Sequence, residues 1–362
     1  MFYSVALSQI KYIPKKIINN ILDENHCYKK TYDEIKEITI HANTKTSNKL
    51  KSQIINDEPL KKAEKIINEC DKKNVEIINE ESPLYPNLLK QCPDKPYVIY
   101  SKGEKNPNNL ILLAIVGTRS CSNYGIENLK LFLNELSKYK IGVVSGLAYG
   151  IDIEAHKISN ELNLPNYAVL GSGVDHVYPR EHLKEAEEII NNGMLMSEYP
   201  PGTKPRRFHF PCRNRIIAGM SKSTIVIESD VKGGATITAR LANEYNRDVF
   251  AIPGNINKRS SKGCNLLIAN HQAQLITDPT EILEYIKLEK NNRKEIINSN
   301  QIKDINKDHR IIYNYIRDNF NTTFNNIQNN LDFTTPELNS ILTCMELEGL
   351  ILQKPGKIYQ IF

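Results

Sequence analysis

The sequence predicts an α/β protein whose largest domain is built on a parallel-rich β-sheet, with a small helical domain before it and a small helix-and-hairpin domain after it. Two observations lead to this prediction. Between residues 110 and 285, short apolar runs alternate with amphipathic stretches, which is the pattern of βαβ units. The first 80 residues have a different texture, because they are rich in Lys, Asn, Ile and Glu and lack this alternation.

The N-terminal region, residues 1–80, is expected to be a helical domain. Its apolar residues recur at the spacing of one helix face, as in Ile17-Ile18-Ile21-Leu22 and Ala63-Ile66-Ile67.

The central domain is expected to span residues 81–286. Its apolar runs predict strands at residues 110–116, 141–145, 167–170, 194–197, 223–228, 248–252 and 274–277. The stretches between them predict helices at residues 127–138, 151–161, 180–191 and 237–245. Strands that alternate with helices in this way pair in parallel, and both faces of the sheet are then covered.

The remainder of the chain is expected to be a linker and a third domain. Residues 287–306 are rich in Asn, Lys and Glu and are typical of a linker. Residues 307–362 contain three helix-like stretches, followed by two short apolar strands around Pro355-Gly356. Three helices and a hairpin are the pattern of a winged-helix domain.

Composition excludes several classes of protein. The longest apolar run, residues 110–116, is far too short to span a membrane. The start of the chain lacks the basic, apolar and small-residue parts of a secretion signal, so we expect a cytoplasmic protein. The seven cysteines are scattered and never form C-x-x-C, which argues against disulfides and a zinc site. We therefore expect neither a metal nor a cofactor.

Glycine-containing turns follow nearly every predicted strand. They lie at Gly117, Gly146, Gly171-Ser-Gly173, Gly233-Gly234 and Gly254. The carboxyl ends of parallel strands meet at one edge of the sheet, where the next helix N-termini offer unpaired N–H groups to anions. The sequence therefore predicts a phosphate-binding rim at this edge.

Other phosphate-binding and catalytic patterns are poorly matched. The chain contains no G-x-x-x-x-G-K-S/T, which argues against a P-loop ATPase. Gly171-Ser-Gly-Val-Asp-His176 begins like a dinucleotide fingerprint, but His176 replaces the third glycine and the stretch follows the third strand. Asp152 and His156 are four residues apart on a predicted helix, where Asp152 is expected to stabilise the first turn rather than to catalyse.

Arginines and aromatic residues are concentrated on the same predicted turns. Residues 206–219 hold four arginines and two phenylalanines with no acidic residue. Arg119 directly follows the first strand, and Arg180 opens a helix after Val177-Tyr-Pro. Three aromatic residues lie beside the arginines: Tyr178, Phe208 and Phe210. Guanidinium groups interleaved with aromatic rings suit a single-stranded nucleic acid, whose phosphates pair with the charge and whose bases stack. We expect one of Arg213 and Arg215 to be structural, because the helix that they begin soon becomes apolar.

These motifs resemble the DprA/Smf family of bacterial DNA-processing proteins. The similarity covers residues 80–285 in order. The matching stretches include Ile115-Val-Gly-Thr-Arg119, Val144-Ser-Gly-Leu-Ala-Tyr-Gly-Ile-Asp152, Leu170-Gly-Ser-Gly-Val-Asp175, Ser197-Glu-Tyr-Pro-Pro-Gly202, Phe208-His-Phe-Pro-Cys-Arg-Asn-Arg-Ile-Ile-Ala-Gly219 and Gly233-Gly-Ala-Thr-Ile-Thr-Ala239.

The resemblance implies an extended Rossmann-like domain that binds single-stranded DNA as a homodimer and loads RecA recombinase onto it during natural transformation, without catalysis or a nucleotide cofactor. The expected DNA-binding residues are Arg119, Ser120, Gly146, Gly171, Ser172, Gly173, Arg180, Phe208, Arg213, Asn214, Arg215, Gly233 and Gly234. The expected dimer contacts are Leu267 and Ile268, in an apolar stretch at residues 264–269.

One departure from the family pattern bears on function. The family's N-terminal domain often carries a glycine-containing helix–hairpin–helix turn, and residues 8–16 have no glycine, so we do not expect residues 1–80 to bind DNA.

The alternative function is that of a Rossmann-like phosphoribohydrolase, an enzyme with a P-G-G-x-G-T-x-x-E motif. The nearest stretch here is Lys232-Gly-Gly-Ala-Thr-Ile-Thr-Ala-Arg240, in which arginine replaces the acidic residue, and this favours binding over hydrolysis.

Overall fold

The computed structural model describes residues 1–10, 13–41, 45–286, 307–319, 322–348, 350–354 and 356–361. The chain divides into two compact units, Met1–Asn291 and Asn292–Phe362. The expected linker, residues 287–306, lies outside the described residues.

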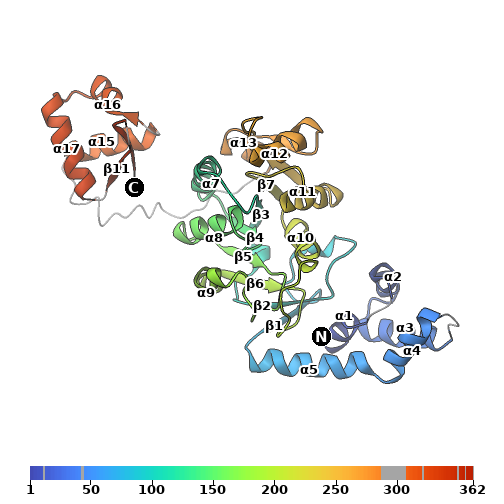
Figure 1. Cartoon of the computed structure of the whole chain (residues 1–362). Coiled ribbons are helices and arrows are strands. Elements are labelled where there is room, and N and C mark those ends of the chain that lie inside the picture. Colours follow the sequence, from blue (N-terminus) through green and yellow to red (C-terminus); the bar gives the residue numbers. More distant parts are fainter. Residues whose placement is uncertain are drawn as a thin grey trace. The chain divides into compact units, whose positions relative to one another are not determined.

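The first unit begins with five helices (Figure 1). They are α1 (Phe2–Ser8), α2 (Lys15–Asn25), α3 (Tyr28–His41), α4 (Lys45–Ile55) and α5 (Glu58–Lys72). Their apolar faces belong to one hydrophobic cluster with part of the central sheet, because Val5, Ile18 and Ile35 are buried in the same cluster as Tyr100 and Leu195. The helical region and the sheet therefore form one compact unit.

A nine-stranded sheet forms the centre of the described part of this unit, in the order β1-β2-β6-β5-β4-β3-β7-β8-β9. The strands are β1 (Glu76–Asn79), β2 (Val98–Lys102), β3 (Ile111–Val116), β4 (Ile141–Ser145), β5 (Asn166–Val169), β6 (Gly193–Ser197), β7 (Ser223–Val226), β8 (Asp248–Ala251) and β9 (Gln274–Leu275). Strands β3 to β9 pair in parallel, as the sequence predicts. The α/β, parallel-rich fold is thus confirmed.

Strands β1 and β2 were not predicted. They extend the sheet in the antiparallel direction, β1 on β2 and β2 on β6. Both are short and lie in a region rich in proline and charged residues, so neither presents a long alternating pattern. Between them lies α6 (Asn87–Lys90), and η1 (Pro107–Asn109) precedes β3.

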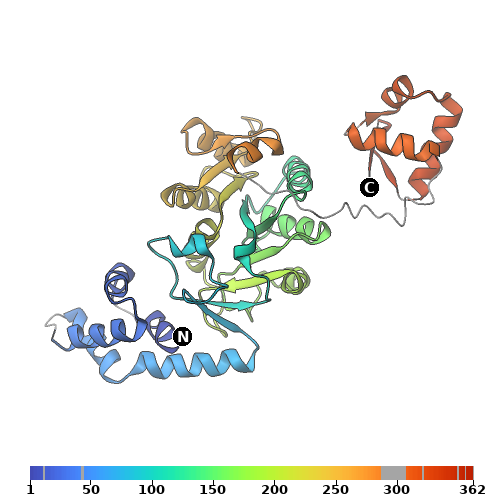
Figure 2. The ribbon, with the colours of Figure 1, turned by 180° about the vertical axis from the view of Figure 1, so that it is seen from behind.

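Helices cover both faces of the sheet, which explains the almost uniformly apolar strands. Helices α7 (Asn123–Leu136), α8 (Ile151–Glu161) and α13 (Pro279–Tyr285) pack on one face, against Leu113 and Ile115. Helices α10 (His209–Met220), α11 (Gly234–Glu244) and α12 (Arg259–Ala269) pack on the other, against Leu112 and Ala114. Figures 1 and 2 show α10 and α11 across the sheet from α7 and α8. Helix η2 (Arg180–His182) leads into α9 (Leu183–Asn191), between β5 and β6.

The second unit has its own small core. Its elements are α15 (Lys307–Asp318), β10 (Thr322–Thr323), α16 (Phe324–Asn330), α17 (Thr335–Leu347), β11 (Ile351–Lys354) and β12 (Ile358–Ile361). The strands form a sheet in the order β10-β12-β11. Ile312, Ile327 and Leu342 pack together with Ile351, so helices and hairpin share one core. The three helices and the hairpin lie where the sequence predicts them.

Two kinds of feature are missing from the described residues. None of their helices has the length and apolar character needed to cross a membrane. In the same residues, no three His, Cys, Asp or Glu side chains gather closely enough to hold a metal ion.

Candidate functional site

A cavity of about 730 Å³ opens at the carboxyl edge of the sheet. Its walls include Gly117 and Arg119, which follow β3, and Asp230 and Gly233, which follow β7. Strand β3 is the switch point of the sheet, because successive strands are added on one side as β4, β5 and β6 and on the other as β7, β8 and β9. Ligands of open α/β sheets bind in the crevice that forms at such a point.

The N-terminus of α11 lies in the cavity wall. Gly233 precedes the helix and provides no side-chain cap, so the N–H groups of the first turn remain open to a ligand. A Cβ at Gly234 would project into open space, with no atom within 4 Å, so the glycine leaves this side of the helix end open. An uncapped helix N-terminus favours an anion through its N–H groups and its dipole. This part of the wall is therefore suited to a phosphate.

Aromatic rings and a guanidinium group line the cavity beside this helix end. The Arg119 guanidinium lies over the ring of Phe210, 5.9 Å from its centroid. The ring centroids of Tyr178 and Phe210 lie 5.7 Å apart, and about half of Tyr178 is exposed. Bases of a single strand stack on such rings while arginine holds the phosphates.

Several arginines near the cavity have no ion-pair partner among the described residues. Arg119 and Arg207 line the cavity, and Arg180 and Arg206 are exposed on neighbouring turns. Exposed guanidinium groups without acidic partners are available to a negatively charged ligand.

Arg213 is buried in the cavity floor and holds the backbone together. Its Nη1 donates to the carbonyl oxygen of Gly146, at 2.7 Å, and to that of Val169. A Cβ at residue 146 would lie 2.2 Å from Nη1, so glycine leaves room for the guanidinium group in this position. Burial raises the pKa of the nearby Asp152 carboxyl, and the Arg213 charge opposes this shift.

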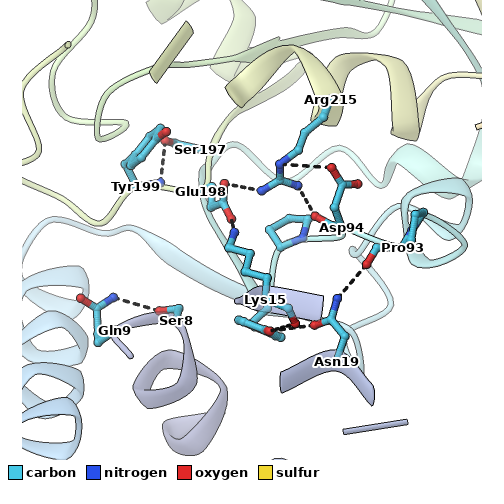
Figure 3. A network of polar contacts seen from close by, with 12 residues as sticks. Ser8, Gln9, Lys15, Asn19, Pro93, Asp94, Ser197, Glu198, Tyr199 and Arg215 are labelled. Atoms are coloured by element: carbon cyan, nitrogen blue, oxygen red, sulfur yellow. Dashed lines mark hydrogen bonds and ion pairs between the residues drawn. The ribbon is translucent and has the colours of Figure 1, made fainter. Parts of the chain in front are cut away.

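Arg215 lies on another side of the same helix, α10, and is also buried. It pairs with Glu198 and donates to the backbone carbonyl of Asp94 at 2.6 Å (Figure 3). The sequence predicts that one of Arg213 and Arg215 is structural, and the structure gives both a bracing role.

Residues 171–173, which follow β5, are not part of the cavity wall. A Cβ on Gly171 would lie 2.9 Å from the ring of Phe210, so the glycine lets this ring pack directly against the backbone. Ser172 is buried and donates to the carbonyl of His176 at 2.6 Å. The N–H of Gly173 donates to Thr203, which joins this turn to the loop after β6.

The other expected site residues divide between the cavity and its surroundings. Asn214 lines the cavity and donates to the Gly234 carbonyl at 3.3 Å. Ser120 and Phe208 are exposed nearby and are not part of the cavity wall. Tyr178, Arg207 and Phe210 also line the cavity, although they were not among the expected DNA-binding residues.

The expected dimer residues differ in exposure. Leu267 is only 5% exposed and packs in the core of its own chain. Ile268 is partly buried against the same core, whereas Leu266 is 42% exposed. A partner would therefore meet Leu266 before Leu267.

Comparison with known proteins gives a consistent result. Residues 76–287 match the family described as DNA recombination-mediator protein A. The chain is 38% identical over 230 residues to Protein Smf of Escherichia coli, an alignment that covers 63% of this chain and 61% of that protein. It is 39% identical over 199 residues to DNA processing protein DprA of Streptococcus pneumoniae, covering 55% of this chain and 70% of the relative.

Two solved structures are similar to the present one. The X-ray structure of DNA processing protein A from Streptococcus pneumoniae matches with a TM-score of 0.66 and 29% identity, over 80% of this chain and 99% of that chain. DNA processing protein A from Helicobacter pylori, described by its single-stranded DNA binding mode, matches with a TM-score of 0.53 and 28% identity, over 58% of this chain and 94% of the other.

The similarity does not extend over the whole of every relative. The aligned part spans 61% of the E. coli protein and 55% of a 39% identical Protein Smf from Synechocystis, where it covers 60% of this chain.

Proposed function

The chain belongs to the DNA recombination-mediator protein A family, and from this premise we propose that it binds single-stranded DNA in the cavity at the switch point of its sheet. The observation that carries the proposal is the combination in one cavity wall of an uncapped helix N-terminus, the guanidinium group of Arg119 without an acidic partner and the exposed ring of Tyr178. The first two bind phosphate and the third binds a base.

The shape of the site favours a single strand over a duplex. The groups that would bind nucleic acid line a concave cavity, and a base must leave its stack to enter it. Duplex readers instead insert a protruding helix or ribbon into a groove. We therefore expect little sequence preference, because stacking and phosphate contacts are available to every base.

An affinity titration tests this function directly. A labelled single-stranded oligonucleotide and its duplex would be titrated with the protein at several salt concentrations. Single-strand affinity should fall with a slope of about −0.7 per neutralised phosphate in log K against log salt, and the duplex should bind more weakly. Arg240→Ala is a suitable control for loss of one charge, because Arg240 is exposed, lies outside the cavity wall and pairs with Glu244. Equal affinity for both DNA forms would contradict the proposal.

We further propose that the protein passes bound DNA to RecA recombinase, as the mediator name of its family suggests. The assay is the rate at which RecA assembles on single-stranded DNA covered by a single-strand-binding protein. A catalytic amount of this chain should shorten the lag, and an unchanged lag would restrict the function to DNA binding.

We propose a homodimer as the acting form, with Ile268 and the more exposed Leu266 of α12 at the contact. Sedimentation of wild type and of Leu266→Glu tests the contact. A variant that sediments like the wild-type dimer would show that the dimer contact lies on another surface.

The phosphoribohydrolase alternative is weakened by one position. Where those enzymes carry their acidic residue, Arg240 lies exposed on α11 and pairs with Glu244 at 3.6 Å. No carboxylate therefore occupies that position to act on a sugar. Release of free base from a nucleotide would restore the enzymatic alternative.

A further inference from the structure

Two lysines of the N-terminal helical region reach carboxylates in the loops after β5 and β6. Lys15, the first residue of α2, pairs with Glu198, which directly follows β6 (Figure 3). Lys73, at the end of α5, pairs with Asp175 in the turn after β5, with 2.9 Å between Nζ and Oδ2. Each lysine thus joins the helical region to a loop at the carboxyl edge of the sheet.

The Asp175 pair holds the two loops to one another. Both carboxylate oxygens of Asp175 accept from the N–H of Gly202, at 2.9 and 3.0 Å. Two residues before Asp175, the N–H of Gly173 donates to the carbonyl of Thr203 at 2.9 Å. Asp175 therefore connects α5, the turn after β5 and the loop after β6. The turn after β5 leads to Tyr178, and the loop after β6 leads to Arg207 and Phe210 in the cavity wall.

The Glu198 pair reaches the cavity along another path. Glu198 binds Lys15 through one carboxylate oxygen and Arg215 of α10 through the other. Figure 3 shows Glu198 between the two cations. Next to Glu198, the ring of Tyr199 stacks on His209 at 3.9 Å, and His209 contacts the carbonyl of Gly171 at 2.9 Å. Glu198 is thus joined to α10 through Arg215, and its neighbour Tyr199 is joined to the start of this helix through His209. Helix α10 carries Phe210 and Arg213.

Burial shows why these carboxylates need cations. The side chains of Asp175 and Glu198 are 12% and 16% exposed, whereas those of Lys73 and Lys15 are 37% and 49% exposed. A carboxylate that is largely removed from water is costly unless it is paired. Burial raises the pKa of Asp175, but Lys73 and the Gly202 N–H outweigh it and bring the pKa to about 2.

We propose that the N-terminal helical segment, residues 1–75, positions the DNA-binding cavity through Lys15 and Lys73. The inference rests on the proposed DNA-binding function and deepens it. Both lysines act through Glu198 and Asp175 and are positioning residues. Neither lines the cavity, and the ammonium group of each is occupied by a carboxylate. The segment therefore contributes to DNA affinity without binding DNA itself.

The test compares Lys15→Met, Lys73→Met and the double variant with the neighbouring changes Lys16→Met and Lys72→Met. Lys16 and Lys72 are exposed and lie in the same helices, so each control removes the same charge without removing either pair. Three quantities would be measured: single-strand affinity against salt, the urea midpoint, and backbone hydrogen exchange in residues 171–178 and 198–205 of the DNA-free protein.

The double variant should bind single-stranded DNA about threefold to tenfold more weakly than the controls, because fewer molecules hold the loops in the binding conformation. Its slope of log K against log salt should equal that of the controls, since no phosphate contact is lost. Exchange in the two loops should accelerate, and Lys73→Arg should restore it. Asp175→Asn, which keeps an acceptor for Gly202, should reproduce the effect if the double variant folds poorly.

Two results would overturn the inference while leaving the proposed function intact. In one, the double variant binds and exchanges like the controls. In the other, its salt slope falls by about 0.7 per lysine, which would make the lysines phosphate ligands. A wild-type protein that binds no single-stranded DNA would instead remove the proposed function together with the inference.

Discussion

Replacing Arg213 with methionine should destabilise the protein in a pH-dependent way. Methionine keeps much of the apolar stem but removes the guanidinium, so the carbonyls of Gly146 and Val169 lose their donor. Asp152, which is 8% exposed, also loses the nearby positive charge. Removing one partner from buried charges of this kind costs about 3–5 kcal/mol. Each unsatisfied buried carbonyl costs about 1–3 kcal/mol, and we assign the lower end for two carbonyls, about 2 kcal/mol, to this part of the loss.

The rest of the loss belongs to Asp152 and depends on its ionisation. The pKa of Asp152 is already raised by burial, and without Arg213 it rises further. A carboxyl group whose pKa is raised by folding stabilises the protein at low pH and loses this contribution as the pH rises through the folded pKa. The difference in unfolding free energy between variant and wild type should therefore shrink from about 4 kcal/mol at pH 7 towards about 2 kcal/mol near pH 4.

Urea unfolding followed by circular dichroism measures this difference, and the chain contains no tryptophan that would allow a simpler optical assay. Arg213→Met combined with Asp152→Asn should be more stable at pH 7 than Arg213→Met alone, because the unpaired carboxylate is gone. A loss of stability that is equal at both pH values, or a double variant no better than the single one, would refute the coupling between Arg213 and Asp152.

Three further predictions concern the cavity and the dimer contact. Arg119→Ala should weaken single-strand affinity about tenfold and reduce the salt slope by about 0.7, whereas Arg206→Ala, outside the cavity wall, should change affinity less than threefold in the same titration. Asp230→Asn should tighten binding about twofold to threefold, because it removes a negative charge from the wall that faces phosphate, and weaker binding would show that the carboxylate itself is needed. Leu267→Ala should lower the free energy of unfolding by about 2–4 kcal/mol in urea because the side chain is buried, and a dissociated but fully stable protein would contradict this.

Most of the central fold could be predicted because its strands are apolar runs that alternate with amphipathic helices. The apolar runs from residue 110 onwards correspond to β3 through β9, and the helix predicted at residues 151–161 has the bounds of α8. Strands β1 and β2 were missed because they lie among prolines and charged residues, and only the short helices α6 and η1 follow them, so they do not fit the strand–helix alternation. The glycine turns were informative because backbone close to a ligand or to a buried guanidinium excludes a side chain, as at Gly146.

The candidate site could be predicted in part. Arg119, Gly233 and Gly234 come together in the cavity wall because they follow two adjacent strands of the sheet. The sequence distinguishes the exposed arginines from the buried ones only in part. Arg213 and Arg215 are both buried, and their partners come from residues as distant in sequence as Gly146 and Glu198. Local sequence contains no information on such pairing, and the same holds for Lys15 and Lys73.

The hydrophobic cluster shared by the N-terminal helices and the sheet has a consequence for biosynthesis. Val5, Ile18 and Ile35 belong to a cluster whose members extend to Leu195, a residue synthesised roughly 120 residues after the end of the helical segment. Chain synthesis at about 5–20 residues per second covers this distance in about 6–24 s, and the helices lack these partners during that time. During that interval their apolar faces are open on the nascent chain, and this segment is where we expect a ribosome-associated chaperone to bind first.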